Sequence, residues 1–161
     1  MLLTADDVDR ATDELASVIR RTPTIASRVV SERSGAQVWL KCENLQRTGS
    51  FKPRGAYLRI SRLSAGERAR GVVAASAGNH AQGVAWAASE LGIASRVYMP
   101  VGAALPKIAA TKAYGAEVVL AGSTVDEALV EAQRHAEAML ALDGSNDGRV
   151  VVIDPLSTKG L

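Results

Sequence analysis

Only one cysteine, Cys42, occurs in this sequence of 161 residues, so no internal disulfide can form. One cysteine and two histidines, at no spacing typical of ligands, also argue against a structural zinc site. Long apolar runs are absent too, since none approaches the length of a membrane-spanning helix, about 20 residues. Asp6, Asp7 and Asp9 interrupt any signal-peptide pattern at the N-terminus. We therefore expect a cytoplasmic protein with no membrane partner.

A large excess of one sign of charge is absent as well. The 19 lysines and arginines nearly balance the 17 acidic residues, which leaves a net charge of +2. No basic stretch is long enough to suggest a nucleic-acid groove, and the arginines at 20–21 and 68–70 are more simply read as solvated helix ends. We expect no nucleic-acid partner. The rest of the composition is typical of a soluble globular protein with a real hydrophobic core.

The first seventy residues contain three predicted elements. Residues 4–20 predict an amphipathic helix that Thr4 caps. Its apolar face consists of Val8, Ala11, Leu15, Val18 and Ile19. Residues 36–43 predict a short strand, and residues 53–63 predict a second helix.

From Gly71 onward the sequence alternates between short apolar runs and amphipathic segments. Strands are predicted at 71–76, 95–100, 116–121 and 149–153, and helices at 80–91, 105–114 and 124–142. Thr124 and Glu127 form a capping-box pair at the start of the last helix. Such alternation is typical of βαβ crossovers. The expected fold class is therefore α/β, an open parallel sheet with helices on both faces.

The stretch "SFKPRGA", residues 50–56, places a lysine where a turn meets a helix. Residues 48–50, Thr-Gly-Ser, predict the turn, and Pro53 fits the first turn of a helix, where its missing N–H costs nothing. Lys52 follows the aromatic Phe51. A lysine is a nucleophile only when neutral, and desolvation beside an apolar neighbour favours the neutral amine. Lys52 is either a solvated lysine or a nucleophile, and its neighbours alone do not decide.

A second motif, "SAGNHAQG" at residues 76–83, follows the first strand of the alternating half. In an open parallel sheet, ligands bind at the carboxyl ends of the strands, and a helix N-terminus there offers N–H groups to an anion. Ser76, Gly78 and Asn79 suit a carboxylate or a phosphate. A tight turn without a ligand has the same local sequence, because Gly and Asn are common turn residues. The motif is not a P-loop, since it lacks the terminal Gly-Lys-Ser/Thr.

Together, "KCENLQRTGSFKPRGA" (41–56) and "SAGNHAQG" (76–83) resemble the fold-type II pyridoxal-phosphate (PLP) enzymes. Within them the sequence is most similar to the threonine/serine dehydratase (threonine ammonia-lyase) group, with serine racemase as its sister. The resemblance runs from about residue 4 to residue 155. It implies the tryptophan synthase β-like fold, PLP as cofactor, a small-molecule amino-acid substrate and, as in the family, a homo-oligomer.

The resemblance also implies roles for individual residues. Lys52 matches the catalytic lysine that carries the cofactor as a Schiff base. Phe51 matches the aromatic near the cofactor ring, and Asn79 matches the asparagine that hydrogen-bonds the ring hydroxyl. The residues that match the loop holding the substrate carboxylate are Ser76, Ala77, Gly78, Asn79 and His80.

Position 77 favours one reaction over another. In serine racemase the residue that matches Ala77 is a serine, which acts as the second acid/base on the opposite face of the α-carbon. Alanine cannot transfer a proton, whereas elimination needs only one base, which Lys52 can supply. We expect β-elimination of L-threonine or L-serine to 2-oxobutanoate or pyruvate and ammonia. The alternatives are a racemase-like enzyme and a non-catalytic α/β module that binds a partner.

The sequence departs from the family near its end. The family's longer chains continue into a glycine-rich loop that holds the PLP phosphate, and none of the 14 glycines here forms such a run. We expect residues 1–70 to be an incomplete N-terminal segment of the large PLP domain, 71–155 a small α/β domain and 156–161 a tail that departs from the family pattern. On this interpretation the chain is truncated, and apolar residues such as Val38, Trp39 and Leu40 lie exposed.

Overall fold

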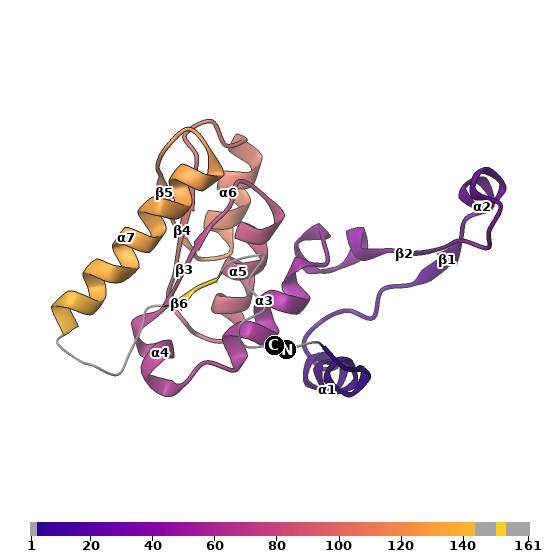
Figure 1. The fold of residues 1–161 in the computed structure, drawn as a ribbon, viewed down its shortest axis with the longest axis horizontal. Coiled ribbons are helices and arrows are strands. Elements are labelled where there is room, and N and C mark those ends of the chain that lie inside the picture. The colour runs from indigo at the N-terminus through magenta and orange to yellow at the C-terminus, as the bar shows by residue number, and fades with distance from the viewer. Residues whose placement is uncertain (1–2, 144–150, 154–161) are drawn as a thin grey trace.

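The computed structural model describes residues 3–143 and 151–153, which form an α/β body and an arm that extends away from it (Figure 1). In chain order the elements are α1 (Ala5–Leu15), β1 (Thr24–Ala26), α2 (Arg28–Ser34), β2 (Trp39–Lys41), the 3-10 turns η1 (Glu43–Leu45) and η2 (Arg47–Gly49), α3 (Lys52–Ser61), α4 (Ala65–Arg70), β3 (Val72–Ala75), α5 (Asn79–Glu90), β4 (Ser95–Met99), α6 (Leu105–Ala113), β5 (Glu117–Leu120), α7 (Val125–Asp143) and β6 (Val151–Val152). No helix in these ranges is long and apolar enough to cross a membrane.

Four strands form one parallel sheet in the order β5-β4-β3-β6, as predicted from the alternating half of the sequence. The register aligns Val72 of β3 with Ser95 of β4 on one side and with Val151 of β6 on the other. The chain therefore builds the sheet outward from β3 through β4 to β5 and then returns to the opposite side of β3. In an open sheet this reversal defines the crevice where ligands bind. The predicted start of the last strand, residues 149–150, lies outside the described residues.

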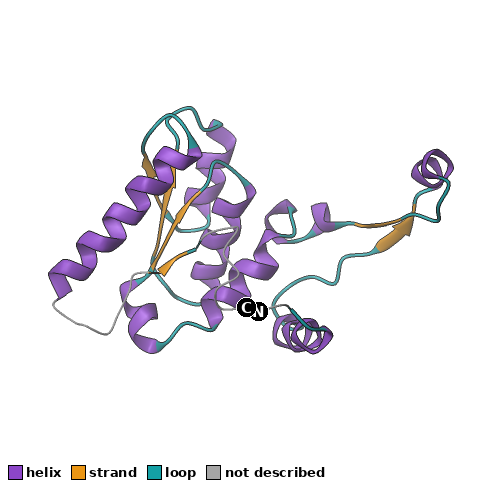
Figure 2. Cartoon of the chain, in the orientation of Figure 1, coloured by secondary structure: helices purple, strands orange, loops and turns teal. Residues whose placement is uncertain are grey.

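Helices cover both faces of the sheet, which confirms the expected architecture (Figure 2). Successive residues of a strand point to opposite faces, and β3 is buried along its whole length. Val72 and Ala74 belong to the core on the α5 side, whereas Val73 and Ala75 pack in a second cluster with α7. α7 contributes three buried alanines spaced four residues apart, Ala128, Ala132 and Ala136. Small side chains at this spacing let a helix lie close to the sheet.

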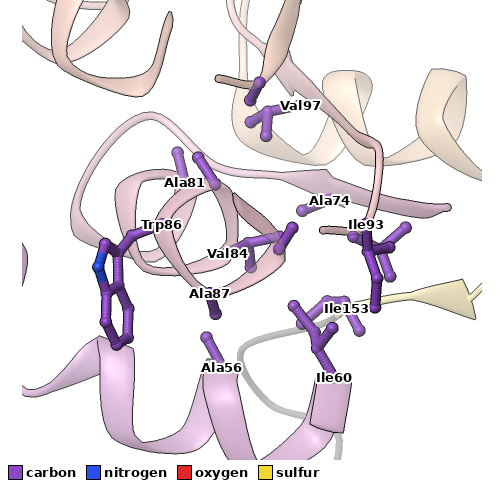
Figure 3. Packing of buried hydrophobic residues seen from close by; sticks show 14 of the residues in the cluster. Ala56, Ile60, Ala74, Ala81, Val84, Trp86, Ala87, Ile93, Val97 and Ile153 are labelled. Atoms are coloured by element: carbon purple, nitrogen blue, oxygen red, sulfur yellow. The ribbon is translucent and has the colours of Figure 1, made fainter. Parts of the chain in front are cut away.

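The larger core joins α3 to the sheet through α5. Ala56 and Ile60 of α3 are buried in the same cluster as Val84 and Ala87 of α5. In Figure 3 the side chain of Ala87 faces Ala56, and Ile153 lies beside Ile60. Residues 52–61 thus share one hydrophobic core with β3, while the division of the chain at residue 70 stays a prediction.

The arm consists of a two-stranded antiparallel sheet with α2 at its tip (Figure 1). β1 pairs with β2 so that Ile25 lies opposite Leu40. Both residues are exposed, and Trp39 is 62% exposed. The exposure predicted for Trp39 and Leu40 is confirmed, whereas Val38 is half-buried. An isolated two-stranded sheet is marginally stable in water.

The N-terminal helix is shorter than predicted. α1 ends at Leu15, five residues before the expected end. Val18 and Ile19 continue the apolar stripe and pack on the core, but their N–H groups donate to Leu15 O in a turn. The next N–H, that of Arg20, donates to the side chain of Gln46 instead of continuing the helix. The predicted cap is confirmed, because Thr4 and Asp7 form a reciprocal capping box.

Other boundaries also differ from the sequence prediction. The strand predicted at 36–43 is only Trp39–Lys41, and β1, α2 and α4 were not predicted. All three are short: β1 has three residues, all exposed, while α2 and α4 contain no buried residue, so no apolar periodicity reveals them. At α7, Thr124 accepts from Glu127 N as expected, but the Glu127 carboxylate accepts from Ser123 N.

Candidate functional site

Lys52 is the first residue of α3 and follows Phe51, which has helical backbone angles. Its side chain is half-buried, and its Nζ lies 5.1 Å from the centroid of the Phe51 ring. Within the described ranges the amine has no hydrogen bond or ion pair. The catalytic role that the sequence assigns to Lys52 stays a prediction.

The turn before Lys52 is conformationally strained. Thr48 has a φ of 60° and Gly49 a φ of 69°, so two consecutive residues adopt the left-handed region. This region is costly for a β-branched residue such as Thr48. The hydroxyls of Thr48 and Ser50 are buried, and neither has a hydrogen-bond partner among the described residues. Strain and unsatisfied polar groups of this kind cluster at functional sites.

Gly83 of α5 fixes the backbone of Lys52 from the other side. A Cβ added to Gly83 would lie 3.1 Å from Lys52 Cβ and 3.2 Å from the Lys52 carbonyl carbon. Only a glycine allows α5 to approach the start of α3 this closely. The helix pair therefore sets the position of Lys52, and the motif residue Gly83 contributes by the absence of its side chain.

Asn79 begins α5, four residues before Gly83, so the two lie on the same helix face. Because Gly83 contacts Lys52, this face carries Asn79 one turn away from the lysine. The Asn79 side chain is exposed, and its Oδ1 accepts a hydrogen bond of 2.9 Å from Lys107 Nζ of α6. That Lys52, Asn79 and Ser76 line one cleft stays a prediction.

The loop between β3 and α5 follows the carboxyl end of β3, which pairs with β6 in the sheet. Ser76 is buried, its N–H donates to Tyr98 O at 3.0 Å, and its Oγ accepts from Gly78 N at 3.2 Å. No side chain caps α5, and its first N–H groups have no acceptor within the helix. A Cβ on Gly78 would meet no atom within 4 Å. Ala77 and Gly78 are half-buried, and the loop has open space beside Gly78.

His80 differs from the other loop residues. Its ring is buried, and Nε2 lies 2.8 Å from the carbonyl oxygen of Ile153, directly after β6. The ring thus links α5 to the residue that follows β6 instead of facing open space. The substrate-binding role predicted for His80 stays a prediction, and in the structure its side chain has a structural contact.

An ion pair supports the start of α3. Arg54, two residues after Lys52, donates to both carboxylate oxygens of Glu43, at 2.7 Å from Nε and 2.8 Å from Nη2. Thr22 Oγ1 donates to the same carboxylate at 2.5 Å. The hydrogen bonds from Arg54 hold the pKa of Glu43 below its usual value. This network joins η1 and the segment after α1 to the helix that carries Lys52.

Sequence reasoning assigned no role to Lys107, Gly83 or Glu43. Gly83 is the last residue of the second motif, and its place in the motif could have indicated a role. Lys107 lies 28 residues from Asn79, and nothing local in the sequence relates the two.

A parallel sheet covered by helices on both faces (Figure 2), with its strand order reversing beside β3, defines an α/β protein of the open-sheet class. Comparison with known proteins identifies the family. Residues 15–157 match the model of the family described as "Pyridoxal-phosphate dependent enzyme". The chain belongs to this family of pyridoxal-phosphate-dependent enzymes.

Similar proteins include the L-threonine ammonia-lyase of Thermotoga maritima, which is 52% identical over 136 residues, 84% of this chain and 34% of the relative. The L-threo-3-hydroxyaspartate ammonia-lyase of a Pseudomonas species is 51% identical over 70% of this chain and 35% of its own. Among solved structures, maize serine racemase has a TM-score of 0.81 at 30% identity and covers 96% of this chain and 44% of its own. The chain thus spans about a third of the length of these two curated relatives.

Proposed function

We propose that this chain carries the lysine-bearing part of a PLP-dependent ammonia-lyase, which acts by β-elimination on L-threonine or L-serine. The products are 2-oxobutanoate or pyruvate, and ammonia. The observation that carries the proposal is the unpaired amine of Lys52, held by Gly83 on the helix face that also bears Asn79. Family membership and the names of the relatives support it.

The residues fit the cofactor. The Lys52 amine would hold the aldehyde group of the cofactor, and Phe51 lies next to it with 59% of its surface exposed. The Asn79 amide suits the ring hydroxyl. When bound, PLP supplies an electron sink for the pair of electrons released at the substrate α-carbon. The protein contributes position and proton transfer.

Each residue then has a defined task. The Lys52 amine would remove the substrate α-proton as a general base. The substrate carboxylate would lie at the uncapped N-terminus of α5, next to the loop residues 76–80, where the helix dipole favours a negative charge. The β-hydroxyl, with a proton, would leave as water, and hydrolysis of the eliminated product would give the oxo acid and ammonia.

A racemase-like activity is the second candidate, because the serine racemase of maize has the same fold over nearly the whole chain. Racemisation requires proton transfer on both faces of the α-carbon. Ala77 carries no titratable group, and it stands in the loop after β3 where a second acid/base is needed. Elimination needs the single base Lys52, so we favour elimination.

The substrate class follows from what the relatives are named for. Threonine and threo-3-hydroxyaspartate both carry a hydroxyl on the β-carbon. We propose a β-hydroxy-α-amino acid as substrate, with threonine or serine as the first to be tested. The single Cys42 supports a reducing compartment such as the cytoplasm. The exposed apolar arm supports self-association into a homo-oligomer, and the division into segments 1–70, 71–155 and 156–161 remains part of this proposal.

Borohydride trapping of the cofactor tests the proposal. The purified chain is incubated with PLP, its visible absorbance is recorded, and the reduced adduct is mapped by mass spectrometry. The adduct is expected on Lys52, absent in Lys52→Ala and retained in the matched control Lys112→Ala, which alters an exposed lysine of α6. Labelling spread over surface lysines, unchanged in Lys52→Ala, would contradict the proposal and favour a non-catalytic module.

Turnover is measured separately with L-threonine and a 2-oxobutanoate assay. Because the chain spans about a third of its relatives' length, we expect it to turn over much more slowly than a full-length relative. Equal turnover from a monodisperse monomer would show that the further residues of the relatives contribute little.

A further inference from the structure

Lys107 is placed against Asn79 by two well-fixed helices. α6, which carries Lys107, packs on α5, which begins at Asn79. The turn around Lys107 is held by its own N–H, which donates to Ala104 O at 2.8 Å. Its carbonyl accepts from the buried Thr111 hydroxyl at 2.8 Å. The Nζ atom then lies 2.9 Å from Asn79 Oδ1.

The chemistry of this contact fixes which way the Asn79 amide is turned. An ammonium group has three donors and no acceptor, whereas a carboxamide has one oxygen that accepts and one NH₂ that donates. Lys107 can therefore bind only the oxygen of Asn79. The NH₂ group of Asn79 is turned away from Lys107 and stays available for an acceptor.

This orientation matters for a ring hydroxyl. A phenolic oxygen accepts a hydrogen bond most strongly when it is ionised, and a donated hydrogen bond favours that ionised form. An amide turned the other way would instead present its oxygen and favour the protonated hydroxyl. Orientation of Asn79 thus decides which form of the ring is stabilised.

We propose that Lys107 is a positioning residue, which holds Asn79 with its NH₂ group directed to the ring hydroxyl of the bound cofactor. The inference rests on the proposed function, since it takes the cofactor site to lie beside Asn79. It assigns Lys107 no contact with the substrate. In a competing role, the hydrogen bond from Lys107 keeps Asn79 from the cofactor. That role predicts tighter binding of PLP when Lys107 is replaced.

The first experiment needs no cofactor. The side-chain amide of Asn79 is observed by NMR in the full chain and in the Lys107→Met, Lys107→Arg and Lys112→Met variants. Lys107→Met is expected to shift the Asn79 amide signals and to speed their exchange with water, whereas Lys107→Arg keeps a donor and Lys112→Met alters an exposed residue elsewhere on α6. Unchanged Asn79 signals in Lys107→Met would overturn the inference.

The second experiment adds PLP. Loss of one hydrogen bond predicts about 3- to 10-fold weaker binding in Lys107→Met. It also predicts a rise of about 0.5–1 unit in the pH midpoint of the cofactor absorbance. Asn79→Asp, which still pairs with Lys107 but cannot donate, is expected to shift the midpoint in the same direction, and Lys107→Arg is expected to restore it.

The two experiments separate the two proposals. Wild-type chain that takes no label at Lys52 would overturn the proposed function and with it the cofactor role of Lys107. The NMR result would still decide whether Lys107 orients Asn79. A labelled Lys52 with unchanged affinity and midpoint in Lys107→Met, or with tighter binding, would overturn the positioning role alone.

Discussion

Replacing Gly83 by alanine tests whether the α3–α5 contact positions Lys52. The new Cβ would lie 3.1 Å from Lys52 Cβ, 3.2 Å from its carbonyl carbon and 3.3 Å from the nitrogen of Pro53. All three distances are shorter than ordinary van der Waals contact, which begins at 3.4 Å. Two of the three atoms are backbone, so no side-chain rotation relieves the clash. The start of α3 must instead move by a few tenths of an ångström.

Two opposing terms set the magnitude. Alanine gains about 1 kcal/mol over glycine inside a helix, and overpacking a core costs about 1–3 kcal/mol. We expect Gly83→Ala to be destabilised by about 0–2 kcal/mol. Gly55→Ala in α3 is the matched control, because a Cβ at Gly55 meets nothing within 4 Å. The propensity gain cancels between the two variants, so their difference of about 1–3 kcal/mol isolates the contact.

Urea unfolding of both variants measures this difference, provided that the slope of the free energy of unfolding against urea concentration is the same in both. Borohydride trapping on the same samples reports the position of the amine. We expect slower labelling of Lys52 in Gly83→Ala than in Gly55→Ala. Equal free energies of unfolding in the two variants would refute the idea that Gly83 is needed for close approach.

Three further predictions concern stability. Glu43→Gln weakens the ion pair with Arg54, and we expect a loss of about 1–3 kcal/mol at pH 7. The pKa of Glu43 is lowered in the folded state, so the wild type loses this stability as the pH falls below 4.5 through the folded pKa. The free energies of urea unfolding of the wild type and Glu43→Gln should therefore differ at pH 7 and lie closer together at pH 3. Thr48→Gly removes a threonine at positive φ and is expected to gain about 1 kcal/mol, which a fall in melting temperature would contradict. Burial and Arg96 lower the pKa of His135 from 6.5, so the free energy of unfolding falls as the pH drops below 6.5. In His135→Asn the melting temperature should therefore depend less on pH than in the wild type.

The sequence predicted the α/β body because its signals are local and agree with the tertiary structure. β3 is buried from end to end, and a continuous apolar run indicates such a strand without further information. Thr4 and Thr124 cap their helices through contacts within four residues. The arm gave no such signal, since Ile25 and Leu40 are exposed and their pairing joins residues 15 positions apart.

Helix ends are decided by tertiary contacts that a periodic pattern does not contain. Val18 continues the apolar stripe of α1 in sequence, yet the backbone leaves the helix after Leu15 because Arg20 hydrogen-bonds Gln46 in both directions. In the candidate site, too, local sequence patterns reveal some residues and tertiary contacts reveal others. Lys52 and Asn79 were found as members of motifs, whereas Lys107 enters only through a contact across space.

α5 relates these observations to one another. Its residues from His80 to Ala88 are all buried, so the helix cannot shift without disturbing the core. On this fixed helix, Gly83 receives the backbone of Lys52, Asn79 meets Lys107 of α6, and His80 binds the carbonyl that follows β6. The spacing between the lysine amine and the amide is therefore set by contacts inside the α/β body. It follows that the exposed arm can be altered, for example by Trp39→Ser, with little change in the rate of borohydride labelling at Lys52.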